Sequence, residues 1–241
     1  MQFSCADGND GLASTAMGLP TRSTLPLWPL PLLAALLPLL VAHLAWWLSM
    51  RDGLIPACNP YWDGCVSISR AARHGLGNQL FRMVMLPCAV VQVLCWIAAT
   101  LWLRRETTSA VRVLPWLGLV AGVFLALYAA FLGSEGRIYE LLRRHGIQLY
   151  FGCTYLALLV VLRTLSRQSV RSPAYRPLFA VAWGFMALGL TSIAVSYMVD
   201  DPQSRDRWEN LLEWHLGLWL TAIFAVLARQ WWHDRLRMRL E

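Results

Sequence analysis

Six apolar segments, each of about 20 residues, limit what this chain of 241 residues can fold into, because that length crosses a bilayer. A helix rises 1.5 Å per residue, so about 20 residues span the roughly 30 Å of the hydrocarbon core. The segments are Leu27–Met50, Phe81–Leu103, Val111–Leu132, Gly146–Leu165, Pro177–Val199 and Trp208–Ala228. The sequence therefore predicts an all-α membrane protein, with a bundle of six transmembrane helices in residues 27–232.

Polar segments flank and connect these spans. Residues 1–26 are rich in Ser, Thr and Gly and show no periodicity, so we expect a disordered tail. Residues 233–241 are expected to form a short basic tail. One connection, Arg51–Leu80, is long, and we expect it to be an ordered loop between the first two spans. In the third connection, Ile138–Arg144 is amphipathic and is expected to lie along the outer surface.

Arginine is distributed unequally between the two ends of the spans. The N-terminal tail, the second and fourth connections and the C-terminal tail hold 12 Arg and 5 acidic residues, whereas the other connections hold 9 of each. Because basic connections stay on the cytoplasmic side, we expect both termini in the cytoplasm and the long loop outside. We expect an integral protein of a bacterial inner (plasma) membrane. Since the Arg residues are scattered among short connections, nucleic acid is not an expected partner.

Two cysteines lie in the long loop. Cys58 and Cys65 enclose a short segment that contains Pro60 and Gly64. Such a loop can bring two thiols together, and an oxidising exterior keeps them bonded, so we predict a disulfide, with two free thiols as the alternative. No Cys or His spacing resembles a zinc site, and we expect neither a metal nor a cofactor.

Polar residues within the spans gather near their outer ends. His43, Tyr128, Gln148, Ser192 and Glu213 all fall within roughly 5–12 Å of the outer boundary, at 1.5 Å per residue. A carboxylate at this depth costs a few kcal/mol and needs a partner or a water-filled cavity. The sequence therefore predicts a polar cavity in the outer half of the bundle, beneath the long loop.

Glu213 is the central residue of this prediction. Its candidate partners are cationic side chains near the long loop and a histidine of the first span: Arg70, Arg73, Arg82 and His43. His215 is two residues further along the helix and so points to nearly the opposite side. Two interpretations remain open, in which Glu213 is a buried anchor that ties the loop to the bundle, or a group that meets a lipid headgroup or a reacting atom.

Four short motifs occur in an order that resembles a known family. They are Ser67-Ile68-Ser69, Asn78-Gln79-Leu80-Phe81-Arg82, Gly152-Cys153-Thr154-Tyr155 and Glu213-Trp214. This arrangement resembles the six-span DRAM-like proteins (damage-regulated autophagy modulators) and their Sfk-type and Frag-type relatives. The resemblance implies a lipid-linked membrane role, such as lipid organisation, anchor remodelling or control of membrane trafficking.

Three functions follow as hypotheses. The first is a non-enzymatic membrane protein whose outer-leaflet cavity binds a lipid headgroup or a second membrane protein. The second is a lipid-modifying enzyme at the outer interface, with Glu213 and a histidine as acid and base. The third is a thiol-redox membrane protein that uses Cys58 and Cys65. The candidate binding residues are Glu213, His215, His43, Arg70, Arg73, Ser67, Ser69 and Tyr155. No catalytic residue is assigned.

Overall fold

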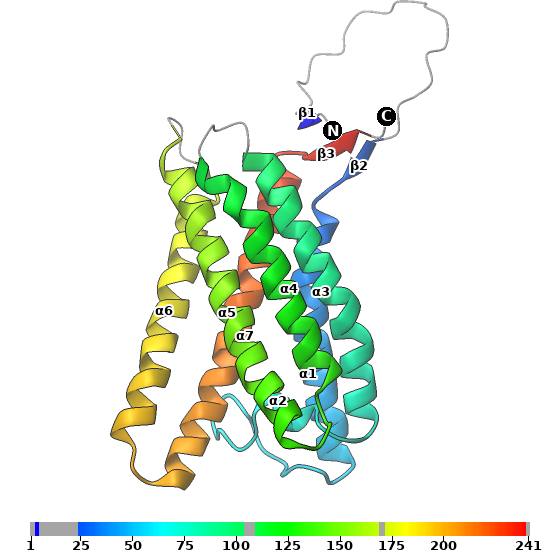
Figure 1. The fold of residues 1–241 in the computed structure, drawn as a ribbon, viewed down its shortest axis with the longest axis vertical. Helices are drawn as coiled ribbons and strands as arrows, with labels where there is room; N and C mark the ends of the chain where they lie inside the picture. Colours follow the sequence, from blue (N-terminus) through cyan, green and yellow to red (C-terminus); the bar gives the residue numbers. More distant parts are fainter. Residues whose placement is uncertain (1–2, 5–23, 104–108, 169–171, 240–241) are drawn as a thin grey trace, which may run out of the picture.

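The computed structural model describes residues 3–4, 24–103, 109–168 and 172–239, and within them the chain is mostly helical. Its long helices are α1 (Pro29–Arg51), α3 (Gly75–Leu103), α4 (Leu114–Ala130), α5 (Arg137–Ser166), α6 (Tyr175–Met198) and α7 (Pro202–His233). The shorter elements are α2 (Ile68–Ala71), the 3-10 helix η1 (Ser109–Val113) and strands β1 (Phe3–Ser4), β2 (Thr24–Pro26) and β3 (Arg237–Arg239). All six long helices are long and apolar enough to cross a membrane, which confirms the predicted six-helix bundle (Figure 1).

The six long helices form a ring in which each packs against its neighbours. The order around the ring is α1, α3, α4, α5, α6, α7 and back to α1, and the contact between α5 and α6 is the least extensive. Residues 52–74, which include α2, cover one end of the ring and are called the lid below (Figure 1). The two termini meet at the opposite, terminal end. We call the part of the bundle next to the lid the lid half, and the part next to strands β1, β2 and β3 the terminal half.

Prolines fix where several of these helices begin. Pro29 in α1, Pro115 in α4 and Pro202 in α7 all lie in the first two positions of their helices. Proline suits these positions because its φ is helical and its missing N–H would have no partner there. The carboxylate of Asp201 then caps α7 by accepting a hydrogen bond from the N–H of Ser204 at 2.8 Å.

Helix α5 differs from the sequence-based expectation. It runs unbroken from Arg137, so Ile138–Arg144 is the start of a long helix and not a separate surface segment. The guanidinium of Arg143 donates to the carbonyls of Phe131 and Ser134, just after the C-terminus of α4. The Phe131 carbonyl also accepts from the Ser134 N–H, so Arg143 ties the first turns of α5 to the turn that follows α4.

Three short strands join the two ends of the chain at the terminal end. They form an antiparallel sheet in the order β1-β3-β2. In contrast to the disorder expected for residues 1–26, β1 and β2 are ordered there, while residues 1–2 and 5–23 lie outside the described part of the chain. The basic tail expected at residues 233–241 contributes β3, because main-chain pairing with β1 and β2 supplies partners that composition alone does not reveal.

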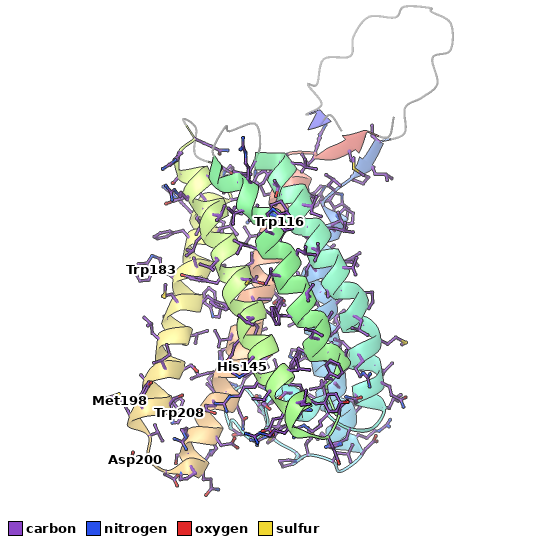
Figure 2. All side chains as sticks on the ribbon, viewed as in Figure 1. Trp116, His145, Trp183, Met198, Asp200 and Trp208 are labelled. Carbon is purple, nitrogen blue, oxygen red and sulfur yellow. A yellow bond between two sulfur atoms is a disulfide. The ribbon has the colours of Figure 1, made fainter. Side chains whose placement is uncertain are left out.

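Large aromatic side chains fill the terminal half. Trp96 is 1% exposed and its ring lies 5.6 Å from that of Phe224, while Trp102 and Trp231 lie 6.2 Å apart. Gly118 admits the Trp96 ring, because a Cβ at Gly118 would lie 2.7 Å from Trp96 Cδ1. The terminal half is therefore close-packed. Other tryptophans, among them Trp116 and Trp183, project outward from the bundle (Figure 2).

Candidate functional site

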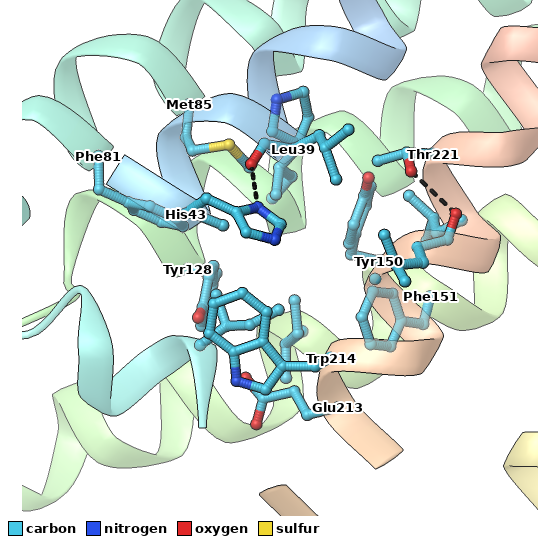
Figure 3. Close-up of a pocket in the computed structure, with 18 of the residues that line it drawn as sticks. Leu39, His43, Phe81, Met85, Tyr128, Tyr150, Phe151, Glu213, Trp214 and Thr221 are labelled. Atoms are coloured by element: carbon cyan, nitrogen blue, oxygen red, sulfur yellow. Dashed lines mark hydrogen bonds between the residues drawn. The ribbon is translucent and has the colours of Figure 1, made fainter. Parts of the chain in front are cut away.

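A cavity lies within the ring of helices, towards the lid, between α1, α3, α4, α5 and α7 (Figure 3). Its empty volume is about 640 Å³, part of it open to the outside. Tyr61 and Ile68 of the lid complete the wall, to which α6 contributes no residue within the described chain.

Most of the cavity wall is apolar, and its polar groups are few. They are His43, Tyr61, Tyr128, Tyr150, Glu213 and Thr221. The Tyr150 hydroxyl donates to the side-chain oxygen of Gln92 at 2.9 Å, and Thr221 donates to the carbonyl of Leu218 at 2.8 Å. Glu213 is the one charged side chain among the described residues that line the cavity.

The Glu213 carboxylate lies where the cavity meets the lid. Its Oε1 accepts a hydrogen bond from the backbone N–H of Ser69 at 3.2 Å, and Arg70 and Arg73 are close enough to stabilise its charge through space. These interactions offset part of the cost of removing a carboxylate from water. The sequence suggested a direct Arg or His43 partner, but the nearest donor is a backbone amide of α2.

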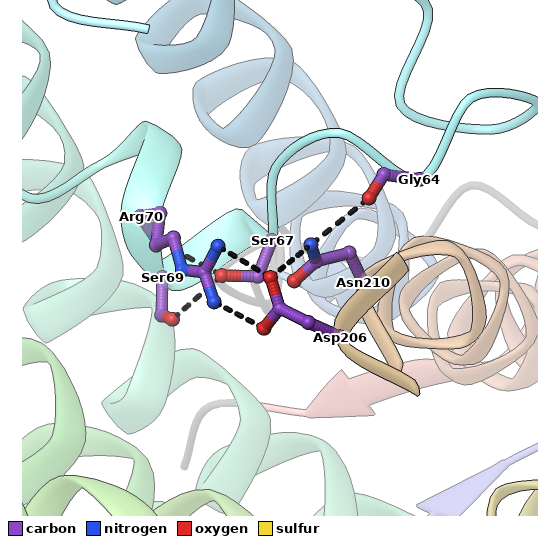
Figure 4. Close-up of polar contacts among 6 residues, drawn as sticks. All are labelled: Gly64, Ser67, Ser69, Arg70, Asp206 and Asn210. Carbon is purple, nitrogen blue, oxygen red and sulfur yellow. Dashed lines mark hydrogen bonds and ion pairs between the residues drawn. The ribbon is translucent and has the colours of Figure 1, made fainter. Parts of the chain in front are cut away.

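Arg70 instead pairs with Asp206 on α7, at the edge of the lid (Figure 4). Its Nη1 donates to Oδ2 at 2.9 Å and its Nη2 donates to Oδ1, so both prongs of the guanidinium are used. Hydrogen bonding to Asp206 raises the pKa of Arg70 above its ordinary value. Because both side chains remain about half exposed, the pair fixes geometry more than it adds stability.

Five side chains of α7 hold the lid. They are Asp206, Arg207, Asn210, Glu213 and Trp214, which lie on one side of the helix because of their three- and four-residue spacing. Arg207 donates to the carbonyl of Asp63 at 3.2 Å. The side-chain amide of Asn210 donates to the carbonyl of Gly64, and the indole N–H of Trp214 donates to that of Val66, each at 2.9 Å. Sequence reasoning missed Asp206 and Asn210. The recurrence of polar residues at helical spacing ahead of an apolar run is the pattern that indicates them.

A disulfide shapes the outer part of the lid. Cys58 and Cys65 are bonded, with their Cα atoms 6.5 Å apart, which confirms the sequence-based prediction. Inside the loop, the Asn59 N–H donates to the carboxylate of Asp63 at 2.8 Å, and the Asp63 N–H donates back to the carbonyl of Asn59 at 2.8 Å. The lid is therefore ordered by its own bonds as well as by α7.

Gly64 marks the closest approach between the lid and α7. Its φ of +59° lies in the region that favours glycine. A Cβ at this position would overlap the backbone carbonyl of Arg207. A larger residue at Gly64 would therefore push the lid away from the helix that holds it.

Aromatic rings cover the side of the cavity next to α1. The Nδ1 of His43 faces the carbonyl of Leu39 at 2.7 Å, so Nδ1 carries the proton and Nε2 accepts from the Tyr61 hydroxyl at 2.9 Å. Burial raises the pKa of Tyr61 to about 12, which keeps this hydroxyl a donor. The Tyr61 ring also lies 5.4 Å from Trp214 and 5.5 Å from His215. His43 thus lines the cavity, whereas His215 touches only the aromatic cluster beside it.

The remaining candidate residues have other roles. Ser67 caps α2, and its hydroxyl lies 3.0 Å from that of Ser69, so both serines shape the lid. Tyr155 joins α5 to α6. Its hydroxyl donates to the carbonyl of Ala182 at 3.4 Å, and its ring stacks on Phe185 at 5.3 Å. Tyr155 is therefore not part of the cavity wall.

Comparisons with family models, with curated proteins and with solved structures found no match to the chain. Within the described residues, His, Cys, Asp and Glu side chains do not gather in groups of three that could hold a metal ion. The fold and the site together define an integral membrane protein with a lidded cavity inside a six-helix bundle.

Proposed function

We propose that the chain binds a membrane lipid in this cavity, with the polar end of the lipid against Glu213, and that it acts without catalysis. The observation that carries the proposal is the combination of apolar walls with a single carboxylate in one partly open cavity. A lipid has the same two parts, a chain that suits the walls and a polar head that suits the carboxylate. In this proposal Glu213 has two roles, since it holds the lid through Ser69 and also meets the ligand.

We also propose that the lid faces outward, with both termini in the cytoplasm of a bacterial cell. The disulfide supports this orientation, since such bonds persist in oxidising compartments, and so does the excess of Arg at the opposite ends of the spans. Trp62 of the lid is 78% exposed, so Trp62→Cys supplies a reporter. We expect a membrane-impermeant maleimide to label Trp62→Cys in intact cells and to leave the wild type, which carries Cys5 in its N-terminal tail, unlabelled. Labelling only after the cells are broken would reverse the orientation.

Native mass spectrometry of the protein, extracted gently from its membrane, tests lipid binding. We expect a phospholipid to remain bound to the wild type and to be lost on Glu213→Gln, which removes the charge while keeping an acceptor for the Ser69 amide. Glu209→Gln is the matched control, because Glu209 lies one turn earlier on α7, is exposed and does not line the cavity. A wild type that carries no lipid, or carries a protein subunit in its place, contradicts the proposal.

A second candidate function is a lipid-modifying enzyme. The observation in its favour is that Glu213 and His43, a possible acid and base, line the same cavity. This candidate predicts that His43→Gln abolishes turnover of an added lipid while the lipid stays bound. Unchanged lipid composition after incubation with the wild-type protein in vesicles would eliminate it.

Two further expectations are weighed against the same site. The thiol-redox hypothesis lacks a second thiol near the lid in the described chain, because Cys88 and Cys95 are buried in α3 and Cys153 lies on α5. Membership of the DRAM-like family is a proposal supported by the four motifs. Of these, Ser67–Ser69 and Glu213-Trp214 lie together at the lid.

A further inference from the structure

One stripe of α6 changes character along its length. In the terminal half it is apolar and buried, at Leu178, Ala182 and Phe185. Beyond Phe185 the same stripe continues at helical spacing as Gly189, Ser192 and Ser196, and α6 has no buried residue from there to its end. The stripe of α6 that is buried in the terminal half is therefore uncovered and polar in the lid half.

The facing part of α5 shows the same change. Tyr155 and Phe151 contact Phe185, with ring distances of 5.3 Å and 6.0 Å. On the lid side of this contact, a Cβ added at Gly189 on α6 would meet no atom within 4 Å. The two helices therefore touch in the terminal half and separate in the lid half, where α6 and α7 splay away from α5 (Figure 1). We call this opening the seam.

The seam reaches the wall of the cavity. Phe151 lines the cavity and also contacts Phe185, so its ring lies between the two spaces. Among the described residues, α5 and α7 both line the cavity and α6 does not. On α5 the polar side chain of Gln148 is exposed, whereas the Ser196 hydroxyl of α6 donates to the carbonyl of Ser192 and to Glu209 on α7.

We infer that the seam is a lateral portal through which a phospholipid with an amine-bearing headgroup enters the cavity from the lid-side leaflet. The inference rests on the proposed function and names its ligand. Charge complementarity selects the headgroup, since Glu213 is the one charged side chain among the described cavity-lining residues and a carboxylate attracts an ammonium group. The polar side chains of the seam carry the headgroup past the apolar walls, and the acyl chains remain in the bilayer or follow through the opening.

The test fills the seam without touching the cavity. Gly189→Trp places a large ring in the open space, whereas Leu190→Trp places the same ring on the next residue, which is 59% exposed and points away from the seam. Both variants and the wild type are reconstituted in vesicles of equal parts phosphatidylethanolamine and phosphatidylglycerol. Bound lipid is then counted by native mass spectrometry at successive times after isotope-labelled lipid is added to the vesicles, and near-wild-type helicity and melting show that each variant is folded.

We expect the wild type to carry phosphatidylethanolamine in preference to phosphatidylglycerol, and Gly189→Trp to reduce the rate of its uptake about tenfold, with Leu190→Trp unchanged. If Gly189→Trp takes up phosphatidylethanolamine as fast as the wild type, the portal is wrong while lipid binding stands. If the wild type takes up phosphatidylglycerol equally well, the amine-bearing ligand is wrong. If the wild type carries no lipid at all, the proposed function fails together with the inference.

Discussion

The two halves of the bundle use the same six helices in different ways. In the terminal half, the rings of Trp96 and Phe224 are in contact. The Trp96 ring lies so close to Gly118 that a Cβ at that position would overlap it. In the lid half, the helices enclose a cavity, and polar side chains hold the lid to α7. Contacts between helices are dense in one half and interrupted in the other. The comparison indicates that large aromatic side chains fill the terminal half, whereas the lid half combines a cavity with polar contacts to the lid.

The polar groups of the lid half are tolerated because they form hydrogen bonds with the lid. Asn210 and Trp214 each donate to a lid carbonyl, and Glu213 accepts from a lid amide. In hydrocarbon, each unpaired polar group costs several kcal/mol. The hydrogen bonds between α7 and the lid offset this cost for the polar groups of the lid half.

Truncation of a terminal-half aromatic is expected to have the largest effect. Trp96→Ala leaves a large void in a close-packed region, and we expect a loss of about 3–5 kcal/mol in the free energy of unfolding. Unfolding in mixed detergent micelles measures it. Trp96→Phe is the control, since it keeps a ring against Phe224 and also removes an indole N–H that is buried without a partner. Equal losses in the free energy of unfolding for Trp96→Ala and for Leu125→Ala at the cavity wall would contradict the proposed difference between the halves.

Removal of the disulfide is expected to have the next largest effect, confined to the lid. Closure of a loop this short stabilises by about 2–3 kcal/mol, so Cys58→Ser with Cys65→Ser should loosen residues 52–74. Hydrogen exchange of lid peptides should accelerate, with exchange in α4 unchanged. Faster exchange throughout the bundle would show that the lid is part of the folding core and not a separate cover.

Adding a methyl group to glycines of the two halves should give effects of opposite sign. Gly118→Ala forces a Cβ against Trp96 and should cost about 1–3 kcal/mol. Gly152→Ala meets open space and should stabilise α5 by up to about 1 kcal/mol, because alanine is the better helix former. Thermal unfolding of both variants in one detergent provides the comparison. A loss at Gly152 as large as that at Gly118 would mean that Gly152 is packed against a neighbour in the membrane.

The smallest effect is expected at the edge of the lid. Arg70→Ala and Asp206→Ala break an ion pair whose members are about half exposed, so their coupling energy should be at most about 1 kcal/mol. A double-mutant cycle at low and high salt measures the coupling, which should shrink as salt rises. Coupling of several kcal/mol that resists salt would place this pair in a much drier site than its exposure indicates.

Much of the fold followed from the sequence because membrane spans are set by length and hydropathy. The six spans, the Cys58–Cys65 disulfide and the meeting of Glu213 with the long loop were all accessible in this way. The start of α5 at Arg137 was not, because it depends on Arg143 capping the neighbouring helix. Such contacts join separate segments of the chain, so the local pattern of residues does not predict them.

The candidate site was accessible only in part. Residue spacing indicated that Glu213 needs a partner, but it could not distinguish an arginine side chain from the Ser69 amide that donates to it. The partner of Arg70 is Asp206, 136 residues away along the chain. The seam between α5 and α6 was not predicted, since it arises from how far two helices diverge, and hydropathy does not report the distance between helices.

A structure of the full chain in lipid nanodiscs that contain phosphatidylethanolamine tests the central claim most directly. The account predicts elongated lipid density inside the ring of helices, between α5 and α7, with its polar end at the Glu213 carboxylate beneath the lid. A cavity closed by its own side chains, with lipid density only on the outside of the ring, would contradict it.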